Sequence, residues 1–215
     1  TRSLLRDWLA SSKRIEFEGI RVPTFVLNHS FPIIAVVGAI RPRLFIATHV
    51  LESLSEEELA AAIAHEYGHL AAGDNFKRSV MRISRAALLI IPCGRSLDRA
   101  WSEASESAAD EHAAQQSSFV ALNLASALVR IARMIPTGQR QVMPAAVSAF
   151  LVGSENAPGV KVRVRRLVEL SATDPRLLAS NASLVRFLPW FVLTLIVVLG
   201  VTIESRPQVL AAVHN

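Results

Sequence analysis

The sequence predicts an α+β fold in which a small β-sheet is followed by a mostly helical domain and then by an apolar helix near the C-terminus. Three observations predict this order. Short β-prone runs broken by glycine and proline occupy residues 14–48. From residue 55 to about residue 135, apolar positions recur at helical spacing. Residues 187–203 form an apolar run without a single charged side chain.

The length and charge of the chain limit the classes of protein it can represent. Its 215 residues allow one or two domains with a sizeable core. The chain has a formal net charge of +5. Four of its basic residues form a run at Lys161, Arg163, Arg165 and Arg166. No aromatic residues are interleaved there and no nucleic-acid-binding motif accompanies the run, so we expect no nucleic-acid partner. The basic run could contact anionic lipid headgroups, or it could be the solvated face of an ordinary helix.

The most specific stretch of the chain is the pentapeptide HEYGH at residues 65–69. Ser55 followed three residues later by Glu58 is typical of a capping box, which predicts that a helix spans residues 55–73. Residues four apart lie on the same face of a helix. The two histidines of the pentapeptide can therefore bind a single ion, as in the HExxH arrangement of zinc enzymes.

A catalytic zinc ion needs three protein ligands and one open position. His65 and His69 would supply two of them. Glu66 follows the first ligand by one residue, so its carboxylate points beside the metal and can act as a general base on a water molecule that zinc activates. The alternative is a helix with two solvated histidines and a surface glutamate.

The third ligand is expected on a second helix, at residues 96–116. Glu106 can bind the metal, and Asp110, one turn later, can accept a hydrogen bond from a ligand histidine. Two other carboxylates on this helix are rivals for the ligand role. Glu103 lies about one turn from Glu106 on the same face, whereas Glu111 is rotated away from that face.

These residues carry a family resemblance. The chain resembles the membrane-embedded zinc peptidases of the β-lactam-sensing signal-transducer (antirepressor) type. The resemblance lies in three stretches that follow one another in the chain: GAIRPRLFIATHVLESLSEEELAAAIAHEYGHLAAGD, then ESAAD, then RVRRLVEL. A sister family, which includes the heat-shock quality-control protease and the prenyl-protein protease, shares the HExxH and ExxAD patterns. Gly38, followed by basic residues at Arg41 and Arg43, favours the first family, as does the short spacer between His69 and Glu106.

The resemblance implies a gluzincin-like zincin domain with one zinc ion per chain. His65, His69 and Glu106 would be the ligands, Glu66 the general base, and Asp110 the hydrogen-bond partner of a ligand. It also implies a protein or peptide substrate, with a transcriptional repressor among the candidates. In such families the sheet offers an edge strand to which an extended peptide can add.

The expected domain order has four parts. Residues 1–135 form the zinc metallopeptidase domain, and residues 136–182 form a linker and a basic juxtamembrane helix. Residues 184–203 form a transmembrane helix, and residues 204–215 a short tail. Basic residues are plentiful before the span and scarce after it, which predicts an integral protein of a bacterial-type plasma membrane with a cytoplasmic catalytic domain.

Three questions stay open at this level. The enzyme could instead be a broad-specificity quality-control metalloprotease of membrane proteins. The fold could also serve as a non-catalytic, metal-stabilised binding module, or as a membrane-surface scaffold without metal. The group that stabilises the oxyanion is not identified, and His112 and several arginines are candidates.

Overall fold

The computed structural model describes residues 2–17, 20–87, 94–135 and 158–173. Contacts divide the chain into one unit at Thr1–Pro175 and another at Arg176–Asn215. All described residues belong to the first unit.

A four-stranded sheet forms from the N-terminal third of the chain. Its strands are β1 (Ser12–Ile15), β2 (Thr24–Leu27), β3 (Ile34–Val37) and β4 (Arg43–Ala47), in the order β1-β2-β4-β3. The β2–β4 pair is parallel, and the other two pairs are antiparallel. The small sheet predicted for residues 14–48 is therefore confirmed, with its first strand starting two residues earlier.

The last strand in this order, β3, has β4 on one side only. The backbone N–H of Ala47 donates to the carbonyl of Ile33 at 2.7 Å, which makes these two residues a hydrogen-bonded pair. Such pairs alternate along an antiparallel ladder. Val36, paired with Leu44, consequently directs its own N–H and carbonyl away from the sheet. The free edge of β3 faces α3, the helix that carries the HEYGH sequence.

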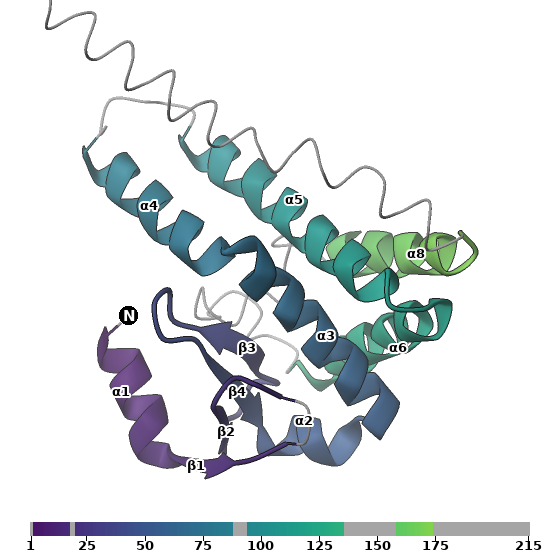
Figure 1. Cartoon of the computed structure of the whole chain (residues 1–215), viewed down its shortest axis with the longest axis horizontal. Helices are drawn as coiled ribbons and strands as arrows, with labels where there is room; N and C mark the ends of the chain where they lie inside the picture. The colour runs from purple at the N-terminus through teal and green to yellow at the C-terminus, as the bar shows by residue number, and fades with distance from the viewer. Residues whose placement is uncertain (1, 18–19, 88–93, 136–157, 174–215) are drawn as a thin grey trace, which may run out of the picture. The chain divides into compact units, whose positions relative to one another are not determined.

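Helices make up most of the described chain, so the predicted α+β class is confirmed (Figure 1). The helix expected at 55–73 is α3, and the one expected at 96–116 is α5. Their bounds, with those of the other helices, are α1 (Arg2–Ser11), α2 (Thr48–Ser53), α3 (Glu56–Ala72), α4 (Asp74–Ala87), α5 (Gly94–Ala114), α6 (Ser118–Met134) and α8 (Pro158–Ser171).

Helix α3 has defined signals at both ends. The Ser55 hydroxyl accepts from the Glu58 backbone N–H at 3.2 Å, and the Glu58 carboxylate accepts from the Ser55 backbone N–H at 3.0 Å. The predicted capping box is thus confirmed. At the other end, Gly73 takes the left-handed conformation with φ 68°, which suits glycine best and ends the helix.

Helix α3 lies between the sheet and the helices α5 and α6 (Figure 1). It packs against β3 on one side and against α5 and α6 on the other, while α8 packs against α5 and α6. One glycine explains how closely α3 and α5 approach. A Cβ added to Gly68 would lie 3.0 Å from Cα of Ala109 and 3.2 Å from Cβ of His112. The glycine of HEYGH therefore lets α5 approach the histidine helix closely.

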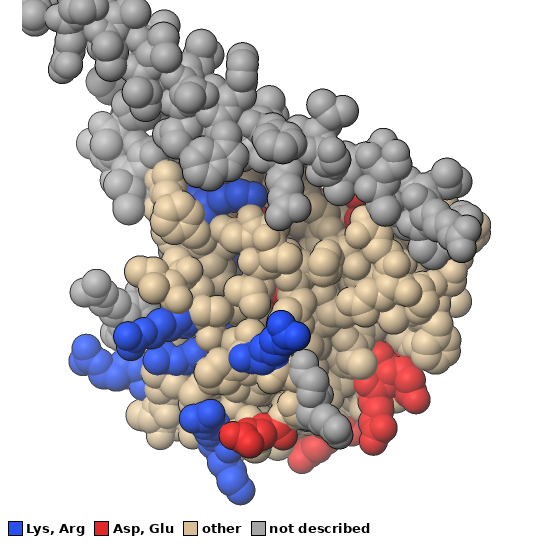
Figure 2. All heavy atoms as spheres, in the orientation of Figure 1, with Lys and Arg blue, Asp and Glu red and all other residues tan. Residues whose placement is uncertain are grey.

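Surface charge is unevenly distributed on the face drawn in Figure 2. Most of the visible basic side chains lie on the left and lower left, and most of the visible acidic side chains lie at the bottom and lower right. This face is therefore not uniformly basic. The charged groups of the site described below are buried and separate from this surface charge.

Of the segments expected in the C-terminal half, the structure describes the basic helix but not the apolar one. The basic segment expected to lie beside a membrane forms α8, which packs into the same unit as the sheet and α3. The transmembrane helix expected at residues 184–203 and the tail at 204–215 lie outside the described residues. Within the described ranges, no helix combines the length and apolar character needed to cross a bilayer.

Candidate metal centre

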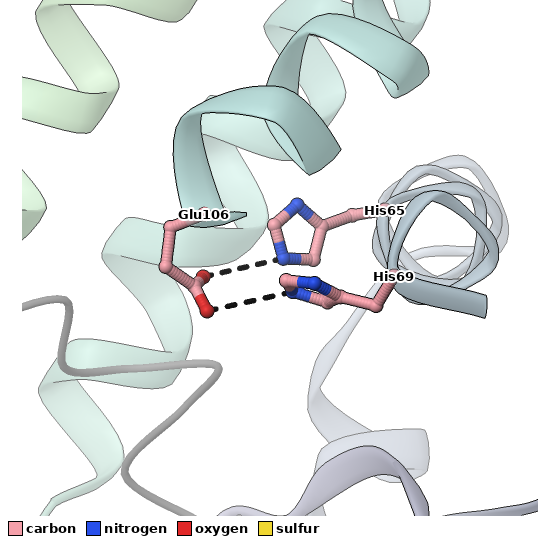
Figure 3. Close-up of side chains that lie close together, drawn as sticks. All are labelled: His65, His69 and Glu106. Atoms are coloured by element: carbon pink, nitrogen blue, oxygen red, sulfur yellow. Dashed lines mark ion pairs between the residues drawn. The ribbon is translucent and has the colours of Figure 1, made fainter. Parts of the chain in front are cut away.

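Three predicted ligands converge between α3 and α5 (Figure 3). His65 and His69 come from successive turns of α3, and Glu106 comes from the middle of α5. Nε2 of His65 lies 3.5 Å from Oε2 of Glu106, and Nε2 of His69 lies 3.4 Å from Oε1. All three residues are at least nine-tenths buried. The structure thus brings together two imidazoles and a carboxylate in one buried cluster.

The cluster fits a metal ion better than it fits direct hydrogen bonding. Nε2 of His69 and Oε1 of Glu106 are buried, and neither has a hydrogen-bond partner among the described residues. Tetrahedral ligands at about 2.0 to 2.2 Å from zinc stand roughly 3.4 Å from one another. The separations of 3.4 and 3.5 Å match this spacing and exceed that of a good hydrogen bond. Two imidazoles and one carboxylate are also the donor set of many catalytic zinc sites.

Carboxylates behind the histidines explain why both rings present Nε2 to the same point. Nδ1 of His65 lies 2.9 Å from Oδ1 of Asp110, as the sequence predicted for a ligand partner. Nδ1 of His69 lies 2.8 Å from Oδ2 of Asp74, whose oxygen also accepts from the Ser105 hydroxyl at 2.6 Å. A carboxylate on Nδ1 fixes the tautomer and orientation of a ligand histidine. Each imidazole is therefore oriented by its own aspartate.

A buried arginine from α8 completes the cluster. The guanidinium of Arg163 donates through Nε and Nη2 to the two oxygens of Asp110, at 2.9 and 2.7 Å. Its third nitrogen, Nη1, lies 3.1 Å from Oε2 of Glu106. This planar fork matches a carboxylate in a way that a lysine ammonium cannot.

The electrostatics of the cluster follow from burial and from these charges. Burial alone would raise the pKa values of Glu106 and Asp110, but Arg163 and the histidines outweigh it, so both pKa values are lowered. Burial likewise would lower the pKa of His69, yet the carboxylates of Asp74 and Glu106 raise it to about 10. A bound cation would compete with protons for these imidazoles.

Glu66 lies beside the candidate ligands and contacts the edge strand β3. Its Oε2 accepts from the backbone N–H of Val36 at 2.7 Å. Burial raises the pKa of this carboxyl, and the nearby His69 and His65 offset only part of that effect. The side-chain amide of Asn75 donates to the carbonyl of Val36 at 2.9 Å. The general-base candidate thus lies between the ligand helix and the outward-facing backbone of β3.

The rival candidates for the third ligand, and the histidine considered for the oxyanion, lie outside the buried cluster. Glu103 is half-exposed and pairs with Arg99 at 3.1 Å. Glu111 pairs with Arg166 of α8. His112, proposed for the oxyanion, has its Cβ against Gly68 where α3 and α5 cross.

Sequence reasoning missed three residues of the cluster, namely Asp74, Ser105 and Arg163. Asp74 lies five residues after His69, just beyond the helix-ending glycine, and this position is the signal in the sequence that indicates a partner for that ring. Arg163 belongs to the basic run at residues 161–166, which by itself does not distinguish it from its solvated neighbours. Its useful signal was the apolar spacing of Val160, Val164 and Leu167 around it, which indicates a helix with one buried face.

Comparison with known proteins supports a peptidase. No protein with a curated description matches the chain. A family model, however, matches residues 24–179, which is 156 of the 215 residues. The matched range starts at β2 and extends beyond α8, so it includes every residue of the buried cluster. The chain belongs to peptidase family M48, a family of zinc metallopeptidases.

Proposed function

We propose that this protein is a zinc-dependent endopeptidase in which Glu66 is the general base. The observation that carries the proposal is the buried set of His65, His69 and Glu106, with the carboxylate of Glu66 beside it at the open edge of β3. A purely structural zinc site is normally closed by a fourth protein ligand. Three ligand residues next to an acidic side chain are instead typical of catalysis.

The chemistry divides between the metal and the chain. Zinc, when bound by His65, His69 and Glu106, supplies a Lewis acid that polarises the scissile carbonyl and makes water a better nucleophile. Glu66 accepts the proton of the attacking water and later passes it to the leaving amine.

The substrate is proposed to be an extended peptide lying along the free edge of β3. Val36 directs its N–H and carbonyl toward that edge, and a peptide in β conformation can pair with such groups. In the described conformation these two groups bind Glu66 and Asn75. A substrate strand therefore competes with these side chains for the backbone of Val36.

The first test is the metal content of the purified full chain. We expect about one zinc ion per chain by elemental analysis, and hydrolysis of an unstructured protein substrate such as casein. A chelator such as 1,10-phenanthroline should abolish the hydrolysis, and added zinc should restore it. Folded protein without zinc would overturn the proposal. Stoichiometric zinc without hydrolysis of any denatured or extended substrate would favour the metal-stabilised binding module instead.

The finer proposal is that the peptidase is anchored in a membrane and takes part in regulated proteolysis. The apolar run at residues 187–203 supports anchoring, and the excess of basic residues before it supports a cytoplasmic catalytic domain. The similarity around Gly38 and Arg41 to the signal-transducer type supports a specific protein substrate, such as a repressor, over broad quality control.

Anchoring can be measured by alkaline carbonate extraction of cell membranes. We expect the full chain to stay with the membrane pellet, because an uncharged apolar helix is not removed by high pH. A chain ending at residue 182 should be released to the supernatant. Release of the full chain under the same conditions would contradict the proposal.

A further inference from the structure

One arginine lies behind two of the three ligand residues. Arg163 reaches Glu106 directly, through Nη1 at 3.1 Å, and reaches His65 indirectly, through the bidentate contact with Asp110. Asp110 in turn lies 2.9 Å from Nδ1 of His65. The guanidinium is therefore placed to fix both the carboxylate ligand and the orientation of one imidazole ligand.

The position of Arg163 in the fold is well determined by its helix. Leu167, one turn later on α8, is fully buried, and α8 packs along α6. Arg166 on the same helix pairs with Glu111 of α5. By contrast, Arg165 points outward and pairs with Glu169 of its own helix at 2.9 Å. Neighbouring arginines of α8 thus differ in role, and Arg163 is the one that reaches the cluster.

The positive charge of Arg163 can offset the repulsion between two buried carboxylates, which an apolar side chain could not do. Glu106 and Asp110 are two buried carboxylates one helical turn apart, and close like charges disfavour ionisation of both. A metal ligand must be ionised, and the partner of His65 must accept its Nδ1 proton. Arg163 places one buried positive charge in contact with both carboxylates, at 3.1 Å from Glu106 and at 2.7 and 2.9 Å from Asp110.

We propose that Arg163 is a positioning residue of the peptidase, which holds Glu106 and Asp110 in the geometry that the metal requires. This proposal rests on the proposed function, because it concerns the same site. It also links helix α8 to catalysis. The zinc site is complete only when α8 is docked on α5 and α6 and delivers the guanidinium.

The test compares three variants of the full chain with wild type. Arg163→Gln removes the charge, Arg163→Lys keeps the charge but loses the fork, and Arg165→Gln is the matched control on the exposed side of the same helix. Zinc affinity is measured by competition with a chromophoric chelator, and kcat and KM with a peptide substrate. Cobalt is then exchanged for zinc, because its visible absorption reports ligand number and geometry directly.

We expect Arg163→Gln to weaken zinc binding about 10- to 100-fold, the usual effect of removing a partner of a metal ligand. Arg163→Lys should fold like wild type, with an intermediate loss of affinity, a changed cobalt spectrum, and a fall in kcat with little change in KM. Arg165→Gln should match wild type in every measurement. The lysine variant keeps the test decisive if the glutamine variant does not fold.

Two outcomes would separate the two proposals. If wild type binds zinc and cleaves peptide, but folded Arg163→Lys keeps the wild-type cobalt spectrum, affinity and kcat, then Arg163 only packs the helices and the inference is wrong. If wild type neither binds zinc nor cleaves peptide, the proposed function itself fails. Circular dichroism and thermal unfolding of each variant identify any loss that comes from misfolding.

Discussion

Replacing Glu66 with glutamine should lower kcat by about 10²- to 10⁴-fold while leaving about one zinc ion bound per chain. Glutamine has nearly the same shape, and its amide oxygen can still accept from the Val36 backbone N–H, as Oε2 of Glu66 does at 2.7 Å. It cannot take a proton from water. The variant therefore removes the proton transfer but leaves the ligands and the strand contact in place.

The comparison needs a control at a carboxylate outside the cluster. Glu103→Gln serves, because Glu103 is half-exposed and pairs with Arg99 on the surface of α5. Its kcat should equal that of wild type. Zinc content by elemental analysis and steady-state kinetics on one peptide substrate are measured for both variants. A Glu66→Gln enzyme with more than about a tenth of wild-type kcat would mean that another group acts as the base.

The sequence indicates the two candidate histidine ligands because their juxtaposition depends on local helix geometry. His65 and His69 are four residues apart on one helix, so the helical repeat alone places them on one face. The same holds for Glu106 and Asp110 relative to each other on α5. The choice among Glu103, Glu106 and Glu111 could not be made this way. It depends on which face of α5 packs against α3, and in the structure Ala109 and His112 of α5 lie against Gly68 of α3.

Residues that reach the site from distant segments could not be predicted for a physical reason. Arg163 is separated from Asp110 by 53 residues, and no local rule pairs them. An isolated basic run on a helix predicts a solvated or lipid-facing side, and burial of one of its arginines becomes favourable only when two carboxylates already lie opposite. Tertiary packing thus decides whether a charged residue belongs to the surface or to the site.

Replacing Glu106 with alanine should have the largest effect on the metal, because it removes a ligand and not a partner of one. Zinc affinity is expected to fall well over about 100-fold, beyond the loss typical of a neighbouring residue, and dialysed protein should retain almost no zinc. The variant also leaves Nη1 of Arg163 without the carboxylate that lies 3.1 Å away. Peptidase activity should disappear together with the metal.

The rivals for the third ligand provide the controls. Glu103→Ala and Glu111→Ala each remove a carboxylate from the same helix, but these side chains pair with Arg99 and Arg166 outside the cluster. Both variants should keep about one zinc ion per chain after the same dialysis. If Glu106→Ala retains zinc while one of the others loses it, the third ligand is misassigned and α5 must turn a different face to α3 in the metal-bound protein. If only Glu106→Ala loses zinc, the face of α5 that packs against α3 in this structure is the one that supplies the third ligand.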